Sequence, residues 1–157
     1  MCLMLYLGSH KSLPLRGNPS LTLEAIPETA QGVRQQVRTE FVYFIGSHSG
    51  CSCGFPHVCS EQAVEYYDGL FDEESPERAL DIASVRELLL VIDEALAGQP
   101  DCVLFPVWTD AAGAAPKGEI RWNRTQLCPE RFLLNEQFRY TIFAEQDAPT
   151  PIGQPDR

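Results

Sequence analysis

The chain has 157 residues, of which 44% are hydrophobic and 10% aromatic, the composition of an ordinary globular protein. A chain of this length buries roughly 68–70% of its unfolded surface, so one domain can fold without disulfides or metals as staples. The formal net charge is −10, from 22 acidic and 12 basic residues, and no basic run is interleaved with aromatic residues. We therefore expect no nucleic-acid partner.

The opening stretch, residues 1–8, is apolar, but it has no basic region before it. It is also too short for a secretion signal or for crossing about 30 Å of hydrocarbon. No later segment has the long apolar run that a transmembrane helix needs. The sequence predicts a cytoplasmic protein that does not contact membranes, in which cysteines are more often ligands, nucleophiles or packing groups than disulfides.

Two apolar runs predict strands that are buried on both faces. They are Cys2–Leu7, which ends at Gly8, and Phe41–Ile45, which ends at Gly46. Between them a loop is predicted over residues 14–19, followed by a half-exposed strand over residues 20–26 that alternates apolar and polar side chains. The spacing of apolar residues in 28–38 indicates a short helix, in spite of the glycine at position 32.

The second apolar strand leads into residues 48–59, where three cysteines and two histidines lie within 12 positions. An even distribution would place about 0.7 such residues there. Thiolates and imidazoles are the ligands that zinc prefers, and Gly50 and Gly54 allow the turn that would bring the two flanked thiols onto one ion. The sequence therefore predicts a zinc site. The candidate ligands are Cys51, Cys53, His48, Cys59, His57 and, from a distant segment, His10.

The inclusion of His10 rests on a short internal repeat. The tripeptide Gly-Ser-His follows both buried strands, ending at His10 and at His48. Strands that are buried on both faces are usually parallel, and in that arrangement both histidines would leave the same edge of the sheet, where open α/β sheets place their sites. Antiparallel neighbours would instead separate the two ends by roughly 17–20 Å and make the Cys/His cluster a local clip.

A thiol-based enzyme is the alternative interpretation of the same loop. Cys51 or Cys53 would be a reactive thiolate, its pKa lowered by an imidazolium such as His48, and its neighbour would resolve it into a disulfide. Removal of Met1 would alternatively leave Cys2 as an amino-terminal nucleophile, although Cys2 opens an apolar strand that would normally be buried. The sequence identifies no catalytic residue and no organic cofactor, so it leaves open whether the chain is an enzyme.

After the loop, Ser60 can cap a helix over residues 61–70. One side of this segment is acidic and carries Glu61, Glu65, Asp68 and Asp72. A solvated helix face is the plainer interpretation of this stripe, although such carboxylates also suit a hard cation. As a third class of function, the acidic face would bind a protein partner.

The next helix is the best marked element. It begins at Ser75-Pro76, or at a capping box over residues 84–87, and ends before Gly98. Its apolar stripe predicts that it covers a sheet and consists of Ile82, Val85, Leu89, Ile92 and Leu96.

Three further strands are predicted over residues 102–105, 119–122 and 139–143, and a helical turn over 129–134. Pro106 indicates an edge position or a bulge at the end of the first of these strands. Cys102, in a buried strand, and Cys128, before a proline, are predicted to be packing groups.

The predicted fold class is a single α/β or α+β domain over residues 1–145, with a mixed sheet, largely buried central strands and one long covering helix. Residues 146–157 contain three of the prolines and form a predicted flexible tail.

Two segments carry a resemblance. The start Met-Cys-Leu-Met-Leu-Tyr-Leu-Gly and the segment Gly46-Ser-His-Ser-Gly-Cys-Ser-Cys-Gly-Phe55 resemble a group of small, uncharacterised bacterial hypothetical proteins. The match covers about a quarter of the chain. Because no activity is known for that group, the resemblance implies no catalytic residues.

Overall fold

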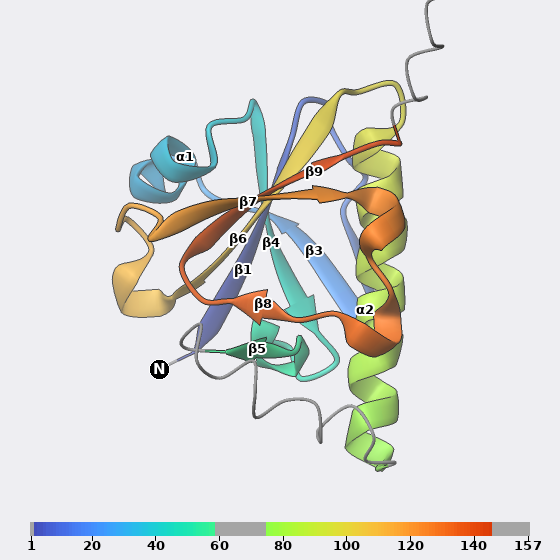
Figure 1. Cartoon of the computed structure of the whole chain (residues 1–157). Helices are drawn as coiled ribbons and strands as arrows, with labels where there is room; N and C mark the ends of the chain where they lie inside the picture. Colours follow the sequence, from blue (N-terminus) through green and yellow to red (C-terminus); the bar gives the residue numbers. More distant parts are fainter. Residues whose placement is uncertain (1, 59–74, 146–157) are drawn as a thin grey trace, which may run out of the picture.

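The computed structural model describes residues 2–58 and 75–145. Its main element is a seven-stranded mixed sheet with the strand order β2-β3-β4-β1-β6-β9-β7 (Figure 1). These strands are β1 Leu3–Ser9, β2 Arg16–Asn18, β3 Leu21–Ala25, β4 Phe41–Ser47, β6 Asp101–Trp108, β7 Gly118–Asn123 and β9 Phe138–Phe143. A second sheet pairs β5, His57–Val58, with β8, Leu134–Asn135. The predicted mixed sheet is therefore confirmed.

Helices cover both faces of the large sheet. The long helix α2, Pro76–Leu96, runs along one face, and the short helix α1, Gln31–Val37, lies on the other (Figure 1). The larger apolar cluster lies under α2 and includes Leu5, Ile45 and Leu104, whereas the smaller one lies under α1. The predicted covering helix is thus confirmed. Among the described residues, no helix is both long and apolar enough to cross a bilayer.

Helix α2 begins at the first of its two predicted start sites. The Ser75 hydroxyl accepts a hydrogen bond from the Arg78 amide at 3.1 Å, and Pro76 occupies the first helical position. The alternative start at Ser84 is wrong, because Ser84 lies inside the helix and is fully buried. A polar residue on the buried face of a helix needs a hydrogen-bond partner, and Ser84 finds it in the loop after β4.

The predicted parallel arrangement of the two apolar strands is wrong. β1 and β4 are antiparallel neighbours, with Leu5 opposite Ile45 and Ser9 opposite Phe41. Both strands are apolar because α1 and α2 cover the two faces of the sheet, so burial on both sides does not require parallel pairing here. Only β7 and β9 run parallel within the large sheet.

Pro106 lies inside β6, opposite Leu5 of β1. The Leu5 amide points away from β6, toward β4, and donates to Ser52. Leu5 and Pro106 therefore form a pair without backbone hydrogen bonds between them, and the amide proton that proline lacks is not needed there. On its second side, the pairing of β6 with β9 ends at Leu104, and the Pro106 carbonyl accepts a hydrogen bond from the Gln137 amide at 2.6 Å. Pro106 is therefore at a local edge within an interior strand.

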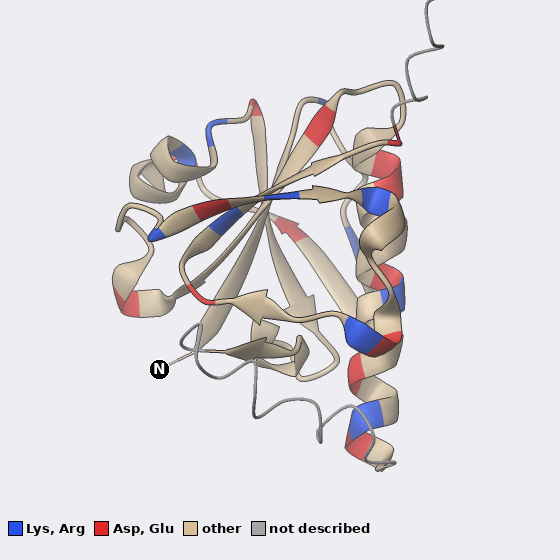
Figure 2. Cartoon of the chain, in the orientation of Figure 1, with Lys and Arg blue, Asp and Glu red and all other residues tan. Residues whose placement is uncertain are grey.

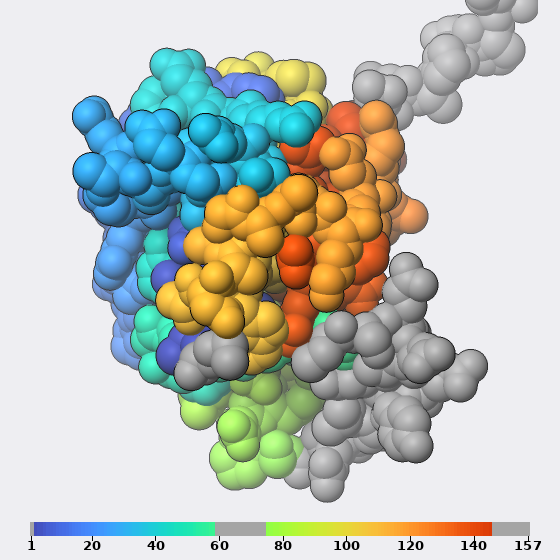
Figure 3. Space-filling view, turned by 90° about the vertical axis from the view of Figure 1, so that its left-hand side faces the viewer, coloured from blue at the N-terminus to red at the C-terminus, as the bar shows by residue number. Residues whose placement is uncertain are grey.

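Helix α1 is shorter than predicted, and its glycine has a packing role. Gly32 faces the segment after β6, and a Cβ at this position would lie 2.9 Å from the Gly113 Cα. The Gln36 side chain donates to the Gly113 carbonyl at 3.3 Å. Figure 3 shows the α1 segment against the chain that follows β6. The predicted loop over residues 14–19 contains the short edge strand β2.

Candidate functional site

The loop that follows β4 is fixed by a turn. The Ser47 amide donates to the Cys51 carbonyl at 2.8 Å, and the Gly50 amide donates to the Ser47 carbonyl at 2.9 Å. Gly50 has a φ of 82°, a left-handed conformation that glycine adopts without steric cost. The Ser47 hydroxyl donates to the Cys51 carbonyl at 2.7 Å and accepts from the Gly54 amide at 3.1 Å. These bonds return the chain toward the sheet with both thiols on one short segment.

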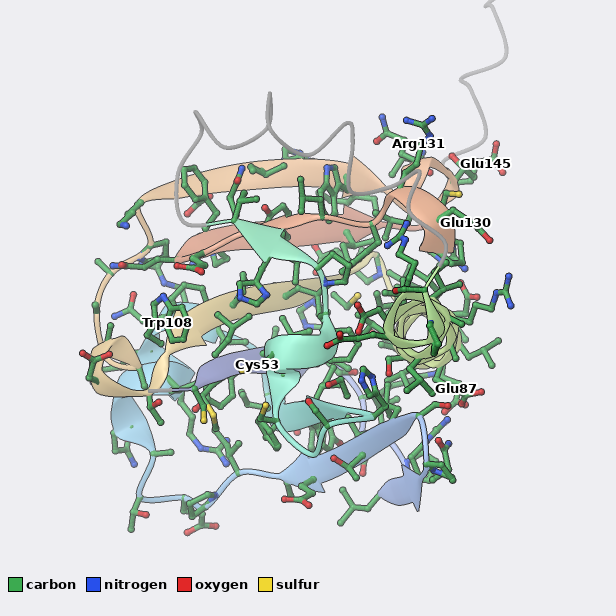
Figure 4. The ribbon with its side chains drawn as sticks, turned by 90° about the horizontal axis from the view of Figure 1, so that it is seen from below. Cys53, Glu87, Trp108, Glu130, Arg131 and Glu145 are labelled. Atoms are coloured by element: carbon green, nitrogen blue, oxygen red, sulfur yellow. The ribbon has the colours of Figure 1, made fainter. Side chains whose placement is uncertain are left out.

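That segment consists of Cys51 and the 3₁₀ turn η1, Ser52–Gly54, which Cys51 caps, and Ser52 anchors it. The fully buried Ser52 hydroxyl accepts from the Leu5 amide at 2.7 Å and donates to the Ile45 carbonyl at 2.6 Å. Leu5 and Ile45 are register partners, so a single hydroxyl bridges β1 and β4. The cysteines on either side of Ser52 are thereby held at the end of the sheet, and Figure 4 shows Cys53 between Trp108 and the end of α2.

Cys51 and Cys53 differ in their expected ionisation. Burial alone would raise the pKa of Cys51, but hydrogen bonds from the Ser49 hydroxyl and from the amide and thiol of Cys53 lower the pKa overall. The Ser49 oxygen and the Cys53 nitrogen each lie 3.4 Å from the Cys51 sulfur. Partial burial raises the pKa of Cys53, and so does its role as donor to Cys51. The pair therefore ionises first at Cys51.

His48 does not face the thiols. Its amide donates to the Ser84 hydroxyl on α2 at 3.0 Å, and its Nδ1 lies 3.3 Å from the same oxygen. The Asp81 carboxylate lies 3.7 Å from this Nδ1. Burial raises the pKa of Asp81, although the charges of both His48 and His57 oppose that shift. The expected activation of a cysteine by His48 is therefore replaced by hydrogen bonds from Ser49 and Cys53.

His57 faces a buried acid. The Nε2 of His57 lies 3.8 Å from Glu136, which is 5% exposed and accepts a hydrogen bond from the Trp108 indole at 2.5 Å. The Nδ1 of His57 lies 2.7 Å from the Phe55 carbonyl, and because a carbonyl only accepts, this nitrogen carries a proton. The pairing of β5 with β8 brings His57 and Glu136 together, since Glu136 directly follows β8.

His10 lies at the other end of the sheet. Its Nε2 contacts the Asp101 carboxylate at 2.7 Å, at the beginning of β6. Antiparallel pairing places Ser9 beside Phe41, whereas the thiol loop follows Ser47, roughly 20 Å further along β4. The predicted shared site of His10 with Cys51 and Cys53 is therefore wrong, and the thiol loop is local to one end of the sheet.

Among the five predicted ligands that lie in the described part of the chain, the structure brings Cys51 and Cys53 together and not the three histidines. Cys59 and the acidic face with Glu61, Glu65, Asp68 and Asp72 lie outside the described residues. Within residues 2–58 and 75–145, no three His, Cys, Asp or Glu side chains are arranged to hold one metal ion.

The remaining described cysteines divide by exposure. Cys102 is fully buried, as predicted, and burial raises its pKa to about 12. Cys128 is exposed and donates to Glu130 at 3.0 Å, so its predicted packing role is wrong. Cys2 precedes β1 and is exposed, in contrast to the buried position expected of a residue in that strand.

Four residues around the loop were missed in the sequence. Ser49, Ser52 and Glu136 are single polar residues without a recognisable motif, and Ser84 was assigned to a helix start instead of to a contact with the loop. For Ser84 a signal existed, because it interrupts the apolar face of a helix otherwise buried against the sheet. For Ser52 and Glu136 the partners are distant in sequence, at Leu5 and Trp108.

Comparisons of the chain with protein-family models, with curated proteins and with solved structures find no match. A function for the chain therefore rests on the geometry of the site.

Proposed function

We propose that the chain is a thiol–disulfide exchange protein whose redox centre is the pair Cys51 and Cys53. The observation that carries this proposal is the placement of two neighbouring thiols, of which Cys51 has the Ser49 oxygen and the Cys53 nitrogen 3.4 Å from its sulfur. Cys51 accepts hydrogen bonds from Ser49 and Cys53 that lower its pKa, whereas the pKa of Cys53 is raised. A nucleophilic thiol beside a thiol that stays protonated is the arrangement that dithiol exchange requires.

The proposed exchange proceeds in two steps. The Cys51 thiolate attacks one sulfur of a substrate disulfide, forms a mixed disulfide and releases the other substrate sulfur as a thiolate, which takes a proton. Cys53 then loses its proton and attacks the Cys51 sulfur, which releases the second substrate thiol. The substrate gains two electrons, and the protein loses two as a Cys51–Cys53 disulfide forms. The reverse sequence oxidises a substrate dithiol.

The backbone of the loop is compatible with this bond. Two residues that are two positions apart are separated by at most about 7 Å between Cα atoms. The turn at η1 shortens this span toward the 4.4–6.8 Å that disulfides use. Exposed disulfides that close such small loops belong to the labile, exchanging kind rather than the structural kind.

The sequence on either side of Cys51 and Cys53 carries no acidic or basic side chains. Residues 41–60 contain no Asp, Glu, Lys or Arg, and Figure 2 shows the charged residues on α2 and on the other strands and loops instead. Among the described residues, the groups that lower the pKa of Cys51 are hydrogen-bond donors, and none of them is a cationic side chain. Such stabilisation is local, so we expect the reactivity of Cys51 to depend weakly on ionic strength.

Peptide mapping after treatment with oxidised glutathione tests the proposal. We expect a loss of two hydrogen atoms per chain, which reduce oxidised glutathione to two thiols, and a Cys51–Cys53 disulfide that thioredoxin-type dithiols reduce. Cys51→Ser should abolish this disulfide, whereas Cys128→Ser, which removes an exposed thiol outside the loop, should leave it unchanged. Equal alkylation rates for Cys51 and Cys128 at pH 7, without disulfide formation, would overturn the proposal.

Soft-metal binding by the same pair is a second proposal. It is supported by the Cys53 amide, which donates to the Cys51 sulfur at 3.4 Å, and by the Leu3 amide, which lies near enough to the Cys53 sulfur to lower its pKa. Hydrogen bonds of this kind stabilise metal-bound thiolates. Elemental analysis of protein from zinc-supplemented medium should give about one equivalent per chain. A value near zero that is unchanged in the Cys51→Ser/Cys53→Ser double variant would exclude zinc binding by these thiols.

A further inference from the structure

The start of β1 brings a third cysteine to the thiol pair. The backbone of Cys2 is held against Thr109, which follows β6: the Cys2 amide donates to the Thr109 hydroxyl at 3.1 Å. In the opposite direction, the Thr109 hydroxyl and amide donate to the Cys2 carbonyl at 2.8 and 3.1 Å. The Cys2 thiol itself is exposed. Residue 2 is thus fixed in place while its side chain stays accessible to other thiols.

The segment that begins at Cys2 runs along the turn η1. The Leu5 amide donates to the Ser52 hydroxyl at 2.7 Å, and the Leu3 amide lies near enough to the sulfur of Cys53 to lower its pKa. Cys2 immediately precedes Leu3, and the hydrogen bond between Leu5 and Ser52 holds this end of β1 against the turn that carries Cys53. In agreement with this placement, the negative charge of a Cys2 thiolate raises the pKa of Cys53. Figure 1 shows the amino-terminal end of β1 beside this loop. Cys2 and Cys53 therefore belong to one group of thiols, although they are about fifty residues apart in sequence.

We propose that Cys2 is a third exchanging thiol, which displaces Cys51 from the Cys51–Cys53 disulfide and forms a disulfide with Cys53. This inference rests on the proposed exchange function and adds a step to it. The Cys2 thiol loses its proton and attacks the Cys53 sulfur. The Cys2–Cys53 bond forms, the Cys51–Cys53 bond breaks, and Cys51 leaves as a thiolate. No electrons are gained or lost by the protein in this step.

The direction of attack follows from the loop. Thiol–disulfide exchange is faster when the leaving thiol has the lower pKa, and of the two loop cysteines this is Cys51. The Ser49 hydroxyl and the Cys53 amide already lie 3.4 Å from the Cys51 sulfur, where they can stabilise the departing thiolate. The relay leaves the oxidised protein with Cys51 free to attack a further disulfide.

The other described cysteines lack this position. Cys102 is fully buried, and Cys128 lies beside Glu130, next to η5 (Pro129–Arg131). Cys128 is exposed, as Cys2 is, but it lies beside η5 and not beside the thiol loop. It therefore serves as the matched control for a thiol that is accessible but not placed beside Cys53.

The experiment uses the full chain with Cys51→Ser and oxidised glutathione as the oxidant. Glutathione first forms a mixed disulfide with Cys53, or with Cys2, and the remaining thiol of the pair displaces it. We expect peptide mapping to find a Cys2–Cys53 disulfide. We also expect Cys53 to lose its glutathione at least about tenfold faster than in Cys51→Ser/Cys2→Ser, a difference typical of intramolecular attack. Adding Cys128→Ser to Cys51→Ser should change neither result.

Persistent glutathione on Cys53 in Cys51→Ser, without a Cys2–Cys53 disulfide, would overturn the relay. The wild-type protein and Cys2→Ser report separately on the proposed function, because both retain Cys51 and Cys53. If they form the Cys51–Cys53 disulfide while Cys51→Ser forms none, the relay alone is wrong. If they form no disulfide while Cys51→Ser forms the Cys2–Cys53 bond, the proposed roles of Cys51 and Cys53 are wrong and the thiol contact stands.

Discussion

The Ser52 hydroxyl accepts a hydrogen bond from the Leu5 amide at 2.7 Å, so the turn that carries the two thiols is attached directly to the central strand of the sheet. The same oxygen donates to the Ile45 carbonyl at 2.6 Å. Replacing Ser52 with alanine would leave both backbone groups buried without this partner.

We therefore expect Ser52→Ala to lower the free energy of unfolding by about 1–3 kcal/mol, the cost of leaving a buried polar group unsatisfied. Urea unfolding at neutral pH measures this change. Ser12→Ala removes an exposed hydroxyl at the other end of the sheet and should change the free energy by less than about 0.5 kcal/mol. Equal stabilities of the two variants would contradict the bridging role of Ser52.

Ser49→Ala should raise the pKa of Cys51. Burial, which raises this pKa, would remain, whereas the hydroxyl that lowers it would be gone. A higher pKa leaves less thiolate at pH 7, so alkylation of Cys51 by iodoacetamide should slow severalfold. In the wild-type protein, the pH profile of alkylation should rise at lower pH for Cys51 than for Cys53, whose pKa is raised. Ser12→Ala is the control here also, and identical profiles for the two cysteines would contradict the assignment.

Gly46→Ala should disturb the loop, because a Cβ at this position would lie 2.5 Å from the Thr22 hydroxyl oxygen and 2.9 Å from the Gly50 carbonyl oxygen. The second contact is with a backbone atom, which cannot rotate away as a side chain can. We therefore expect the free energy of unfolding to fall by about 1–3 kcal/mol and the reactivity of Cys51 to change. At Gly17 a Cβ would meet only Thr22, at an ordinary 3.8 Å. Thermal unfolding of the Gly46→Ala and Gly17→Ala variants compares the two positions. Similar melting temperatures of these variants would contradict the close approach of other atoms to Gly46.

Cys102 should resist alkylation in the folded protein. Burial raises its pKa to about 12, and its side chain has no exposure to solvent. At pH 8 it should therefore react only when the molecule opens, at a rate that urea increases in step with unfolding. The exposed Cys128 should react at once and serves as the internal reference. Prompt labelling of Cys102 without denaturant would place it outside the core.

Asp81→Asn should change stability in a pH-dependent way. Burial raises the pKa of Asp81, so its ionisation is less favourable in the folded state than in the unfolded chain. The neutral acid contributes its stability below the unfolded-state pKa, and this contribution is lost as the pH rises through the folded-state value. Relative to the wild type, the asparagine variant should thus gain stability between about pH 3 and pH 7. Chemical denaturation of both proteins at these two pH values measures the difference between their free energies of unfolding. If this difference is the same at both pH values, the raised pKa of Asp81 is contradicted.

The fold could be predicted from the sequence where local patterns determine structure. Two apolar runs became β1 and β4, and the cap at Ser75 with the stripe through Leu89 became α2. The direction of pairing could not be predicted in this way, because an apolar strand covered on both faces has the same composition whether its neighbour is parallel or antiparallel.

The position of the candidate site could be predicted from the sequence, but the set of residues that form it could not. The cysteine spacing correctly indicated that Cys51 and Cys53 would be neighbours. His48 and His57 were predicted to join them because they lie in the same segment, and His10 because of the Gly-Ser-His repeat, yet each histidine lies near a carboxylate, at Asp81, Glu136 and Asp101 respectively. These carboxylates come from other elements, so their positions follow from tertiary packing, which sequence spacing does not contain.

The anchoring of the loop also has a consequence for the order of folding. Ser52 bonds a residue 47 positions away, and His48 bonds Ser84 at a separation of 36. Contacts of such length form only after the intervening chain has closed into loops, whose entropic cost delays them relative to local structure. We therefore expect the turn that holds Cys51 and Cys53 to be anchored late in folding. Until then the short-range hydrogen bonds to the Cys51 sulfur have no fixed turn around them, and we expect the two thiols of a newly made chain to react alike.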